Sequence, residues 1–482
     1  MEPSKENKED SSYTKSMKMR LMIYFFFLGI INHLGTILVM TGGRILSYEL
    51  NLSSWMYFYT SASTLFNILT RFINSRYLVH ISYKKRITFL CFWMCSGYLI
   101  MSLVLISYEK KYISNNKVCF FLSLIPSFIL GTSYALGESA ILAYLSTFPK
   151  NLVGGFSSGT GLSGLFSASL NFASQYYPNL RPKALYLFLA PLGPIYLFLF
   201  LLTERIQMEA NFGKKYQFEK LNTDEENNNN NNVNDNSDNN NNNNNNDNND
   251  ESDNTNKNKP MNVENFKHVM NCIKRIILNL FLIYLSQFYC LNGMFVKNSA
   301  RTDIGFLPIQ CSREKNGHTY RSGKYEFLIL FYQIGMFTSK SMLFIVKKIQ
   351  PIEIFLFSIL SILFFFIMDY FFYFVDYYFF IPLLFGLGFF GGGTYVAAFY
   401  SILSNKELGL EYKDISVNCA TIANDFGTFL SGIIGYLINN SIFKNETLYE
   451  KYIKNDTLIE GNNCCNNDTS CPYKNRSFLF DL

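Results

Sequence analysis

The stretch Gly155-Phe156-Ser157-Ser158-Gly159-Thr160-Gly161-Leu162-Ser163-Gly164 opens an apolar segment that is long enough to cross a membrane. Another apolar segment, which carries Glu138, lies immediately before it. The hydrocarbon core of a bilayer offers no water to backbone groups or to carboxylates. A helix rich in glycine and serine beside a buried acid therefore indicates close helix packing around a polar pathway.

Apolar runs of membrane-spanning length recur along the chain. A bilayer core of about 30 Å needs about 20 apolar residues per helix. Such runs fall at 19–40, 54–70, 87–107, 119–146, 153–176 and 184–203, and then at 275–297, 325–346, 352–371, 377–403 and 414–440. The sequence predicts an all-α polytopic membrane protein with about eleven transmembrane helices, six followed by five.

Composition narrows the class of protein further. The chain has 49% hydrophobic and 16% charged residues, and 48 Phe and 33 Tyr suit a lipid environment. The net charge of +6 is spread over loops, so we expect membrane lipids as partners and no nucleic acid. No metalloprotease box, Walker motif or nucleophile elbow occurs, so we expect neither an enzyme nor a cofactor or metal site.

A polar, asparagine-rich break separates the two groups of apolar runs. Such a tract cannot bury enough apolar area to fold. We expect a cytosolic N-terminal tail at 1–18, a transmembrane half at 19–203, a disordered cytosolic loop at 204–270, a second transmembrane half at 271–440 and a lumenal tail at 441–482. A long polar loop after six helices is also where major-facilitator transporters join their halves.

Basic residues predict that the N-terminus is cytosolic. They precede the first run, follow the second and follow the eighth: Lys15, Lys18, Arg20; Arg71, Arg76, Lys84, Lys85, Arg86; Lys347, Lys348. Five basic residues within 298–324 run against this orientation.

The expected lumenal tail contains two kinds of modification signal. Glycosylation-type sequons begin at Asn445, Asn455, Asn467 and Asn475. Cys464, Cys465 and Cys471 lack the spaced partners of a zinc site, so a disulfide among them is open and its connectivity is unspecified.

The glycine-rich segments resemble nucleotide fingerprints only in their spacing. Gly159–Gly164 and Gly386–Gly391 both match G-x-G-x-x-G, but each lies within or at the mouth of an apolar run and lacks the required βαβ context. Gly155 and Gly159, like Gly388 and Gly392, have the G-x-x-x-G spacing of closely packed membrane helices. Packing alone and a polar lining formed with Ser157, Ser158 and Thr160 both remain open.

Acids inside apolar runs are the main candidate site residues. Glu138 and Asp425 each need pairing, protonation or water inside the membrane. Either acid serves as a proton or substrate site, or it pairs structurally with another helix; for Glu138 the candidate partners are Arg71 and Lys340. Lys340 could snorkel to the interface or attract an anion into a cavity. Asn32 and His33 share the first run. His33 is interpreted more simply as a structural hydrogen-bond donor than as a proton relay.

A faint repeat relates the two groups of runs. Glu138–Ser146 lies over Gly393–Ser401, and each piece ends one helix and leads into another that is rich in small residues. Parallel repeats of this kind relate the halves of major-facilitator proteins.

The run from Leu136-Gly137-Glu138 through Ser157–Gly161 to Gly164 resembles the most characteristic block of the battenin family. Further resemblances lie in Gly29–Asn32, in Tyr332-Gln333 with Gly335, Phe337, Ser339 and Ser341, in Gly391-Gly392 with Tyr395, Val396 and Phe399, and in Asp425, Gly427, Ser431 and Gly432. The resemblance covers all the apolar runs but not the asparagine-rich loop or the tail.

This resemblance implies a major-facilitator-like fold in a lysosomal or vacuolar membrane. It also implies links to glycerophosphodiester clearance, to basic amino-acid content and to lumenal pH. The resemblance marks ten positions as lining a cavity or gate: Glu138, Ser157, Ser158, Gly159, Thr160, Gly161, Tyr332, Gln333, Tyr395 and Asp425. We add Asn32 and Lys340 to these candidate cavity residues.

Three positions depart from the family pattern. Gln287 replaces an acid and cannot titrate, which puts proton coupling there in doubt. Lys340 replaces an arginine and loses the bidentate fork that suits phosphate, and Tyr400 replaces a histidine.

Two functions follow as hypotheses. The first is a transporter that moves a small polar metabolite, either a glycerophosphodiester or a basic amino acid, with protons as a candidate coupled ion. The second is a non-transporting membrane adaptor that regulates trafficking or acidification. The sequence names no protein partner.

Overall fold

The computed structural model describes residues 13–50, 52, 55–78, 81–176, 181–210, 263–295, 309–314, 317–322, 324–342, 352–372, 377–405 and 407–441. The predictions for the N-terminal tail up to residue 12, for 211–262 within the asparagine-rich loop, and for the tail from 442 lie outside these residues. The tail predictions concern Cys464, Cys465, Cys471, Asn445, Asn455, Asn467 and Asn475.

The first six expected spans are all helical. They are α2 (Lys15–Glu49), α3 (Tyr57–Arg76), α4 (Tyr83–Glu109), α5 (Asn116–Leu145), α6 (Val153–Tyr176) and a sixth span over Pro182–Ala210. The short 3₁₀ turn η3 (Lys150–Leu152) leads into α6. The sixth span is α7 (Pro182–Leu189) followed by a helix at 192–210. Its break falls at Pro191, whose nitrogen has no hydrogen to donate to the helix.

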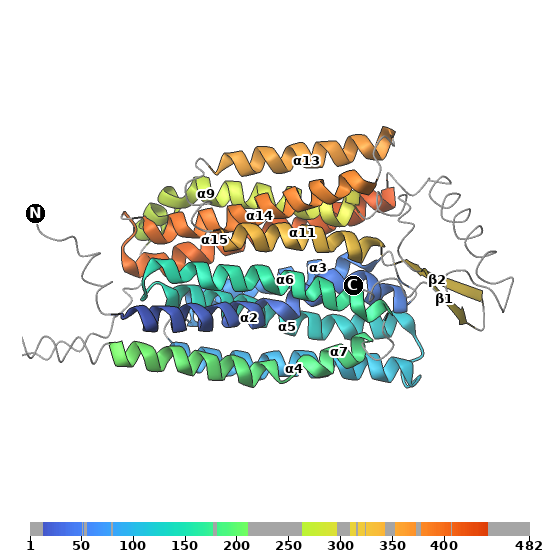
Figure 1. Cartoon of the computed structure of the whole chain (residues 1–482), viewed down its shortest axis with the longest axis horizontal. Coiled ribbons are helices and arrows are strands. Elements are labelled where there is room, and N and C mark those ends of the chain that lie inside the picture. The colour runs from blue at the N-terminus through green and yellow to red at the C-terminus, as the bar shows by residue number, and fades with distance from the viewer. Residues whose placement is uncertain are drawn as a thin grey trace, which may run out of the picture.

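The last five expected spans are also helical. They are α9 (Val263–Tyr289), which continues into the π-helical turn η5 (Cys290–Phe295), then α11 (Lys324–Ser341), α13 (Glu353–Phe372), α14 (Tyr377–Ser404) and α15 (Leu410–Ser441). A small antiparallel hairpin, β1 (Ile309–Glu314) and β2 (Gly317–Ser322), pairs Ile309 with Ser322 and Glu314 with Gly317. The hairpin lies beyond one end of the bundle (Figure 1).

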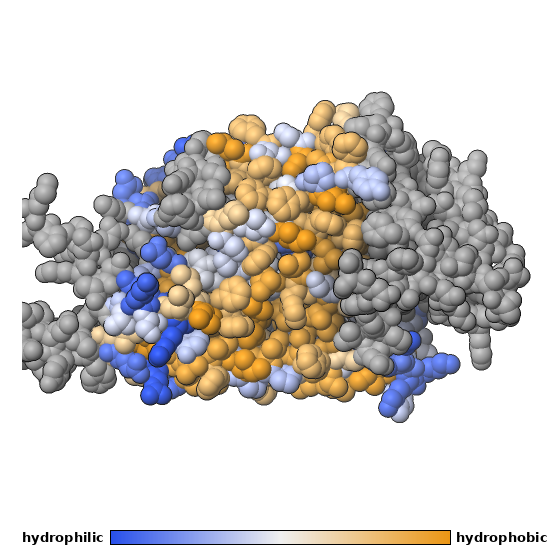
Figure 2. Space-filling view, viewed as in Figure 1, coloured by the Kyte–Doolittle hydropathy of each residue, from blue (hydrophilic) through white to orange (hydrophobic). Residues whose placement is uncertain are grey.

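The prediction of an all-α membrane fold is confirmed. The helices run roughly side by side along the bundle (Figure 1). Among the described residues, six helices are long and apolar enough to cross a membrane. Figure 2 shows, on the face in view, an apolar band across the middle of the bundle with hydrophilic side chains towards its ends, as expected for a surface that faces a bilayer.

Several helices are longer than their apolar runs. The first covers Lys15–Glu49 although its apolar run covers 19–40, because a helix continues past the hydrocarbon core wherever its backbone bonds remain satisfied. The second extends to Arg76, beyond the run at 54–70. The orientation prediction counted Arg71 among the charges at the membrane surface. The structure corrects this, because Arg71 belongs to α3 and its side chain is fully buried within the protein.

Contacts between helices follow a two-fold pattern. In chain order α2, α3, α4, α5 and α6 correspond to α9, α11, α13, α14 and α15. Within the first group α2 packs on α6, α3 on α5 and α4 on α5; within the second α9 packs on α15, α11 on α14 and α13 on α14. Between the groups α3 packs on α15, and the corresponding pair α11 and α6 also packs. The described helices therefore form two similar groups that meet along two related contacts.

Glycines allow two of these pairs to touch backbone to backbone. A Cβ at Gly159 of α6 would overlap Phe26 O of α2, and a Cβ at Gly427 of α15 would lie 2.6 Å from Phe281 O of α9. Only glycine permits such an approach between membrane helices. Both G-x-G-x-x-G matches lie in helices α6 and α14, as the rejection of a nucleotide site predicted.

Candidate functional site

Arg71 of α3 is the centre of a buried charged cluster between the two helix groups. Its Nε donates to Asp425 Oδ2 of α15 at 2.6 Å, and its Nη2 donates to Glu138 Oε2 of α5 at 2.5 Å. Nη1 donates to Ser139 Oγ at 3.1 Å and to Ala135 O at 3.5 Å. The guanidinium thus binds two carboxylates at once, and one of them comes from the second helix group.

Glu138 links two other helices to this cluster. Its Oε1 accepts a hydrogen bond of 2.5 Å from the Tyr395 hydroxyl of α14 and lies 3.4 Å from His33 Nε2 of α2. The Glu138 side chain is 1% exposed. In a medium of low dielectric constant a carboxylate persists only when it is paired and hydrogen-bonded, and Glu138 meets both conditions.

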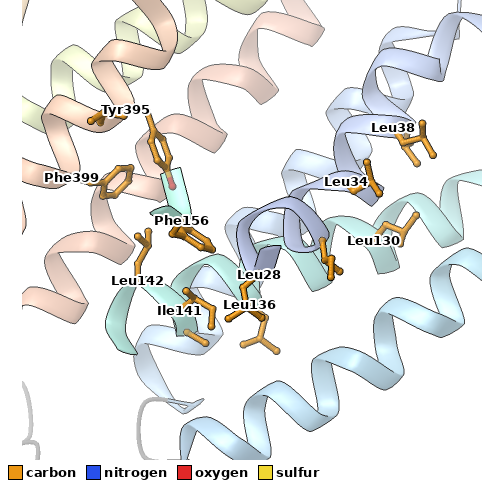
Figure 3. Packing of buried hydrophobic residues seen from close by; sticks show 14 of the residues in the cluster. Leu28, Leu34, Leu38, Leu130, Leu136, Ile141, Leu142, Phe156, Tyr395 and Phe399 are labelled. Atoms are coloured by element: carbon orange, nitrogen blue, oxygen red, sulfur yellow. The ribbon is translucent and has the colours of Figure 1, made fainter. Parts of the chain in front are cut away.

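His33 also packs against an aromatic side chain of this region. Its ring contacts Tyr134 edge to face at 4.6 Å between centroids, and the Arg71 guanidinium lies 5.4 Å from the centre of the Tyr134 ring. Figure 3 shows the apolar surroundings, with Phe156 of α6 near Tyr395 and Phe399 of α14. This apolar shell strengthens the electrostatic interactions it encloses.

Lys340 of α11 forms a second polar cluster beside the first. Its Nζ donates to Thr160 Oγ1 of α6 at 3.1 Å and lies 4.5 Å from the centre of the Tyr395 ring. The side chain is buried, so it does not snorkel to an interface. Within the described part of the chain no carboxylate lies within ion-pairing distance of its ammonium group.

The Ser157–Gly161 turn of α6 has two faces. Gly159 contacts α2, and a Cβ at Gly161 would lie 3.2 Å from Lys340 Cβ. Ser158 Oγ donates to Lys340 O at 3.4 Å, and Thr160 receives the ammonium group. Ser157 is buried, and its Oγ has no hydrogen-bond partner among the described residues. The turn therefore combines helix packing on one face with a polar contact on the other.

The remaining predicted site residues lie around these clusters. Gln287 Nε2 of α9 donates to the Tyr332 hydroxyl of α11 at 2.6 Å, and a Cβ at Gly164 of α6 would overlap the Gln333 amide. Asn32 Nδ2 donates to Tyr134 O at 3.2 Å, which ties α2 to α5. The structure thus brings Glu138, Asp425, Tyr395, Thr160 and Lys340 together but leaves Asn32, Gly159, Tyr332 and Gln333 in neighbouring helix contacts.

Arg71 is the central residue that the site prediction omitted. It stands at the polar end of an apolar run and was counted with the charges at the membrane surface. The signal that points to it is the presence of two acids within spans, since each requires a cation, and Arg71 was one of two candidate partners for Glu138.

The charges of the two clusters balance. Arg71 and Lys340 oppose Glu138 and Asp425, and only the arginine is in contact with carboxylates. Among the described residues no group of three His, Cys, Asp or Glu side chains is arranged to hold a metal ion. The arrangement suits ion pairing and recognition of a polar solute between two helix groups.

A third contact between the groups lies towards the end at which α2 finishes. Arg44 Nη1 of α2 is 3.7 Å from Glu326 Oε2 of α11, and Phe172 of α6 lies 6.1 Å from Phe327 between ring centroids. At the same end, in the contact between α3 and α15, the ring centroids of Phe58 and Tyr436 lie 5.1 Å apart. These contacts join the groups at the end opposite to the start of α2.

Comparison with known proteins identifies sequence relatives along most of the chain. The model of one protein family, described as CLN3 protein, matches residues 23–445. Battenin of Dictyostelium discoideum is 24% identical over 439 residues, which cover 89% of this chain and 96% of the relative. Protein BTN1 of Debaryomyces hansenii is 22% identical over 366 residues, which cover 74% and 78% respectively.

Solved structures with the same fold are membrane transporters. The major facilitator proton:xylose symporter XylE, bound to 6-bromo-6-deoxy-D-glucose, aligns with a TM-score of 0.51 and 9% identity over 89% of this chain and 96% of its own. A POT family transporter in complex with a thioalcohol-conjugated peptide aligns with a TM-score of 0.51 and 11% identity over 91% and 93%. At such identities the likeness concerns the fold alone.

Proposed function

Because the chain belongs to the CLN3 protein family and has a major-facilitator-like fold, we propose that it transports a small polar metabolite across the membrane of an acidic compartment, a lysosome or vacuole. Family and fold support a transporter-like membrane protein. The compartment, the substrate and any effect on lumenal pH belong to the proposal.

The observation that carries the proposal is the buried cluster of Arg71, Glu138 and Asp425. It joins α3 and α5 of the first group to α15 of the second. A purely structural contact between helices can be made with apolar side chains at lower cost, because burying ions requires desolvation. Ionisable residues inside a membrane commonly mark substrate or ion pathways.

The substrate class follows from the chemistry of the two clusters. Arg71 is saturated by carboxylates, whereas Lys340 retains donors that a negatively charged group can accept from. A glycerophosphodiester is therefore our first candidate, and a basic amino acid attracted by Glu138 and Asp425 is the second.

Flux measurements on purified protein in liposomes test the proposal. We expect uptake of glycerophosphoglycerol or of arginine by the wild type and at least a tenfold slower rate for Glu138→Gln and Asp425→Asn, since a change of about 1.4 kcal/mol alters a rate tenfold. Ser361→Ala is a matched control, because Ser361 Oγ bonds only to Phe357 O on the exposed face of α13.

Two results would contradict the proposal. One is folded wild-type protein that carries neither solute above the rate of empty liposomes, which would favour the adaptor hypothesis. The other is unchanged flux in both acid variants, which would make the cluster purely structural.

A further inference from the structure

We propose that at one of the two related contacts, between Lys340 and Ser157, the protein supplies no carboxylate, and that the negatively charged group of the solute takes that place. The inference rests on the proposed transport function and specifies which part of the solute binds where. The class of group is a monoanion, either a phosphodiester or a carboxylate.

The glycines of α6 and α15 set the correspondence between the two groups. Gly159 meets the backbone of α2, and Gly427 meets the backbone of α9. Five residues further on, Gly164 meets Gln333 of α11, and Gly432 meets Ser61 of α3. Both pairs of glycines thus occupy equivalent places, and α6 aligns with α15 without a gap.

This alignment places Ser157 over Asp425, because each stands two residues before its first glycine. In the second group Asp425 supplies the carboxylate that receives Arg71 of α3. At the equivalent place in the first group, α6 supplies a hydroxyl. The carboxylate of one contact between the groups therefore has no counterpart in the other.

The cation of the second contact is present. Lys340 of α11 touches Thr160 and Gly161, which lie three and four residues after Ser157 and hence on the same helix face. Lys340 follows Gln333 by seven residues, whereas Arg71 follows Ser61 by ten. The difference is about one helical turn, which the long side chains of lysine and arginine span.

Unmet hydrogen-bonding capacity marks the same place. The Ser157 hydroxyl is buried and has no partner among the described residues, and the Lys340 ammonium uses one hydrogen bond, to Thr160. No described carboxylate is in ion-pairing contact with the Lys340 ammonium group, and buried polar atoms are normally satisfied. A monoanionic group bound here accepts from both side chains and completes the ion pair that Asp425 completes on the other side.

Thermal unfolding of purified protein tests this anion position without any solute. Ser157→Asp introduces a carboxylate, and Ser157→Asn is its neutral control of equal size. We expect the aspartate variant to unfold at a higher temperature than the asparagine variant when Lys340 is present, and at a lower one in the Lys340→Met background. Equal unfolding temperatures in both backgrounds would overturn the inference.

Flux tests the role of the position in binding. We expect Ser157→Asp and Lys340→Met each to raise the KM for the transported probe by at least about tenfold, as the loss of a charge-assisted contact implies. Ser361→Ala, on the exposed face of α13, should leave the KM unchanged. If the KM for glycerophosphoglycerol depends on Lys340, the bound group is a phosphodiester. If the KM for arginine depends on Lys340, the bound group is the amino-acid carboxylate.

The two proposals fail in different ways. Flux that persists unchanged in Lys340→Met and Ser157→Asp would overturn the anion position while leaving transport intact. Absence of flux in the wild type would overturn the proposed substrates, and the unfolding comparison would still decide whether the position accepts an anion. Should Ser157→Asp not fold, the KM of Lys340→Met decides the question alone, because that substitution removes the cation without adding a carboxylate and breaks no ion-pairing contact with a described carboxylate.

Discussion

At the scale of single residues, Arg71 is the buried cation that pairs with two carboxylates from different helices, Glu138 of α5 and Asp425 of α15. Replacement by methionine leaves Glu138 and Asp425 buried without their cation. We expect a loss of about 3–5 kcal/mol of stability, as is typical when one partner of a buried ion pair is removed. Thermal unfolding in detergent measures it, and a variant as stable as the wild type would show that water replaces the cation.

Tyr395 offers a milder change at the same site. Tyr395→Phe keeps the ring beneath Lys340 and removes the hydroxyl that donates to Glu138. We expect a loss of about 1.5–3 kcal/mol, the usual value of a hydrogen bond to a charged group. Tyr98→Phe is a suitable control because the Tyr98 hydroxyl has no hydrogen-bond partner among the described residues. Equal effects of the two substitutions would contradict the assigned bond.

The sequence offered Arg71 or Lys340 as the partner of Glu138, and the structure shows Arg71, but the sequence did not indicate that Asp425 shares the same cation. Glu138 and Asp425 stand out because each interrupts an apolar run, a signal that is local in sequence. Their pairing is not local: Arg71 and Asp425 are 354 positions apart. Arg71 itself sits at the end of an apolar run, where a charge is usually at the interface, and only tertiary packing shows that the helix continues and buries it.

At the scale of helices, prediction was most successful because a bilayer permits few structures. An apolar run of about 20 residues becomes a helix, since no other single segment satisfies its own backbone. The break at Pro191 and the hairpin β1–β2 were not predicted, because one lies within an apolar run and the other in a polar loop. Close helix packing at Gly155 and Gly159 was predicted as one of two interpretations, but the sequence did not indicate that α2 is the partner of α6.

Two glycines allow a matched test of helix packing. Gly159→Ala places a methyl group on Phe26 O, whereas a Cβ at Gly386 meets its nearest atoms at 3.6 and 3.8 Å, an ordinary contact distance. We expect Gly159→Ala to destabilise by about 1–3 kcal/mol through overpacking. Gly386→Ala should be neutral or stabilising by up to about 1 kcal/mol through helix propensity.

Thermal unfolding of the two alanine variants side by side measures the difference. Similar unfolding temperatures would mean that α2 moves away from α6 at little cost. The close backbone contact would then not be a fixed feature of the fold.

At the scale of the whole molecule, alternating access requires the two helix groups to separate at one end while they close at the other. Arg44 and Glu326 join them at the end where α2 finishes. We expect the double variant Arg44→Cys/Glu326→Cys to lose flux when a bifunctional methanethiosulfonate reagent bridges the two thiols and to regain it on reduction, because the cross-link prevents that end from opening.

The single-cysteine variants are the controls for this experiment, since six described cysteines are free and any of them could react. Loss of flux in the single variants as well would assign the effect to another thiol. Full flux in the cross-linked double variant would show that this end does not open during transport.

The backbone contacts at Gly159 and Gly427 have a mechanical consequence. Where two helices touch through their backbones, no layer of side chains can rearrange between them. We therefore expect α2 to move together with α6, and α9 together with α15, as rigid pairs. The sliding surfaces are then α3 against α15 and α6 against α11, which carry the polar clusters. In the proposed transport cycle, the side chains that we propose to bind the solute therefore lie on the surfaces that slide, so solute binding is expected to alter how easily the two groups move.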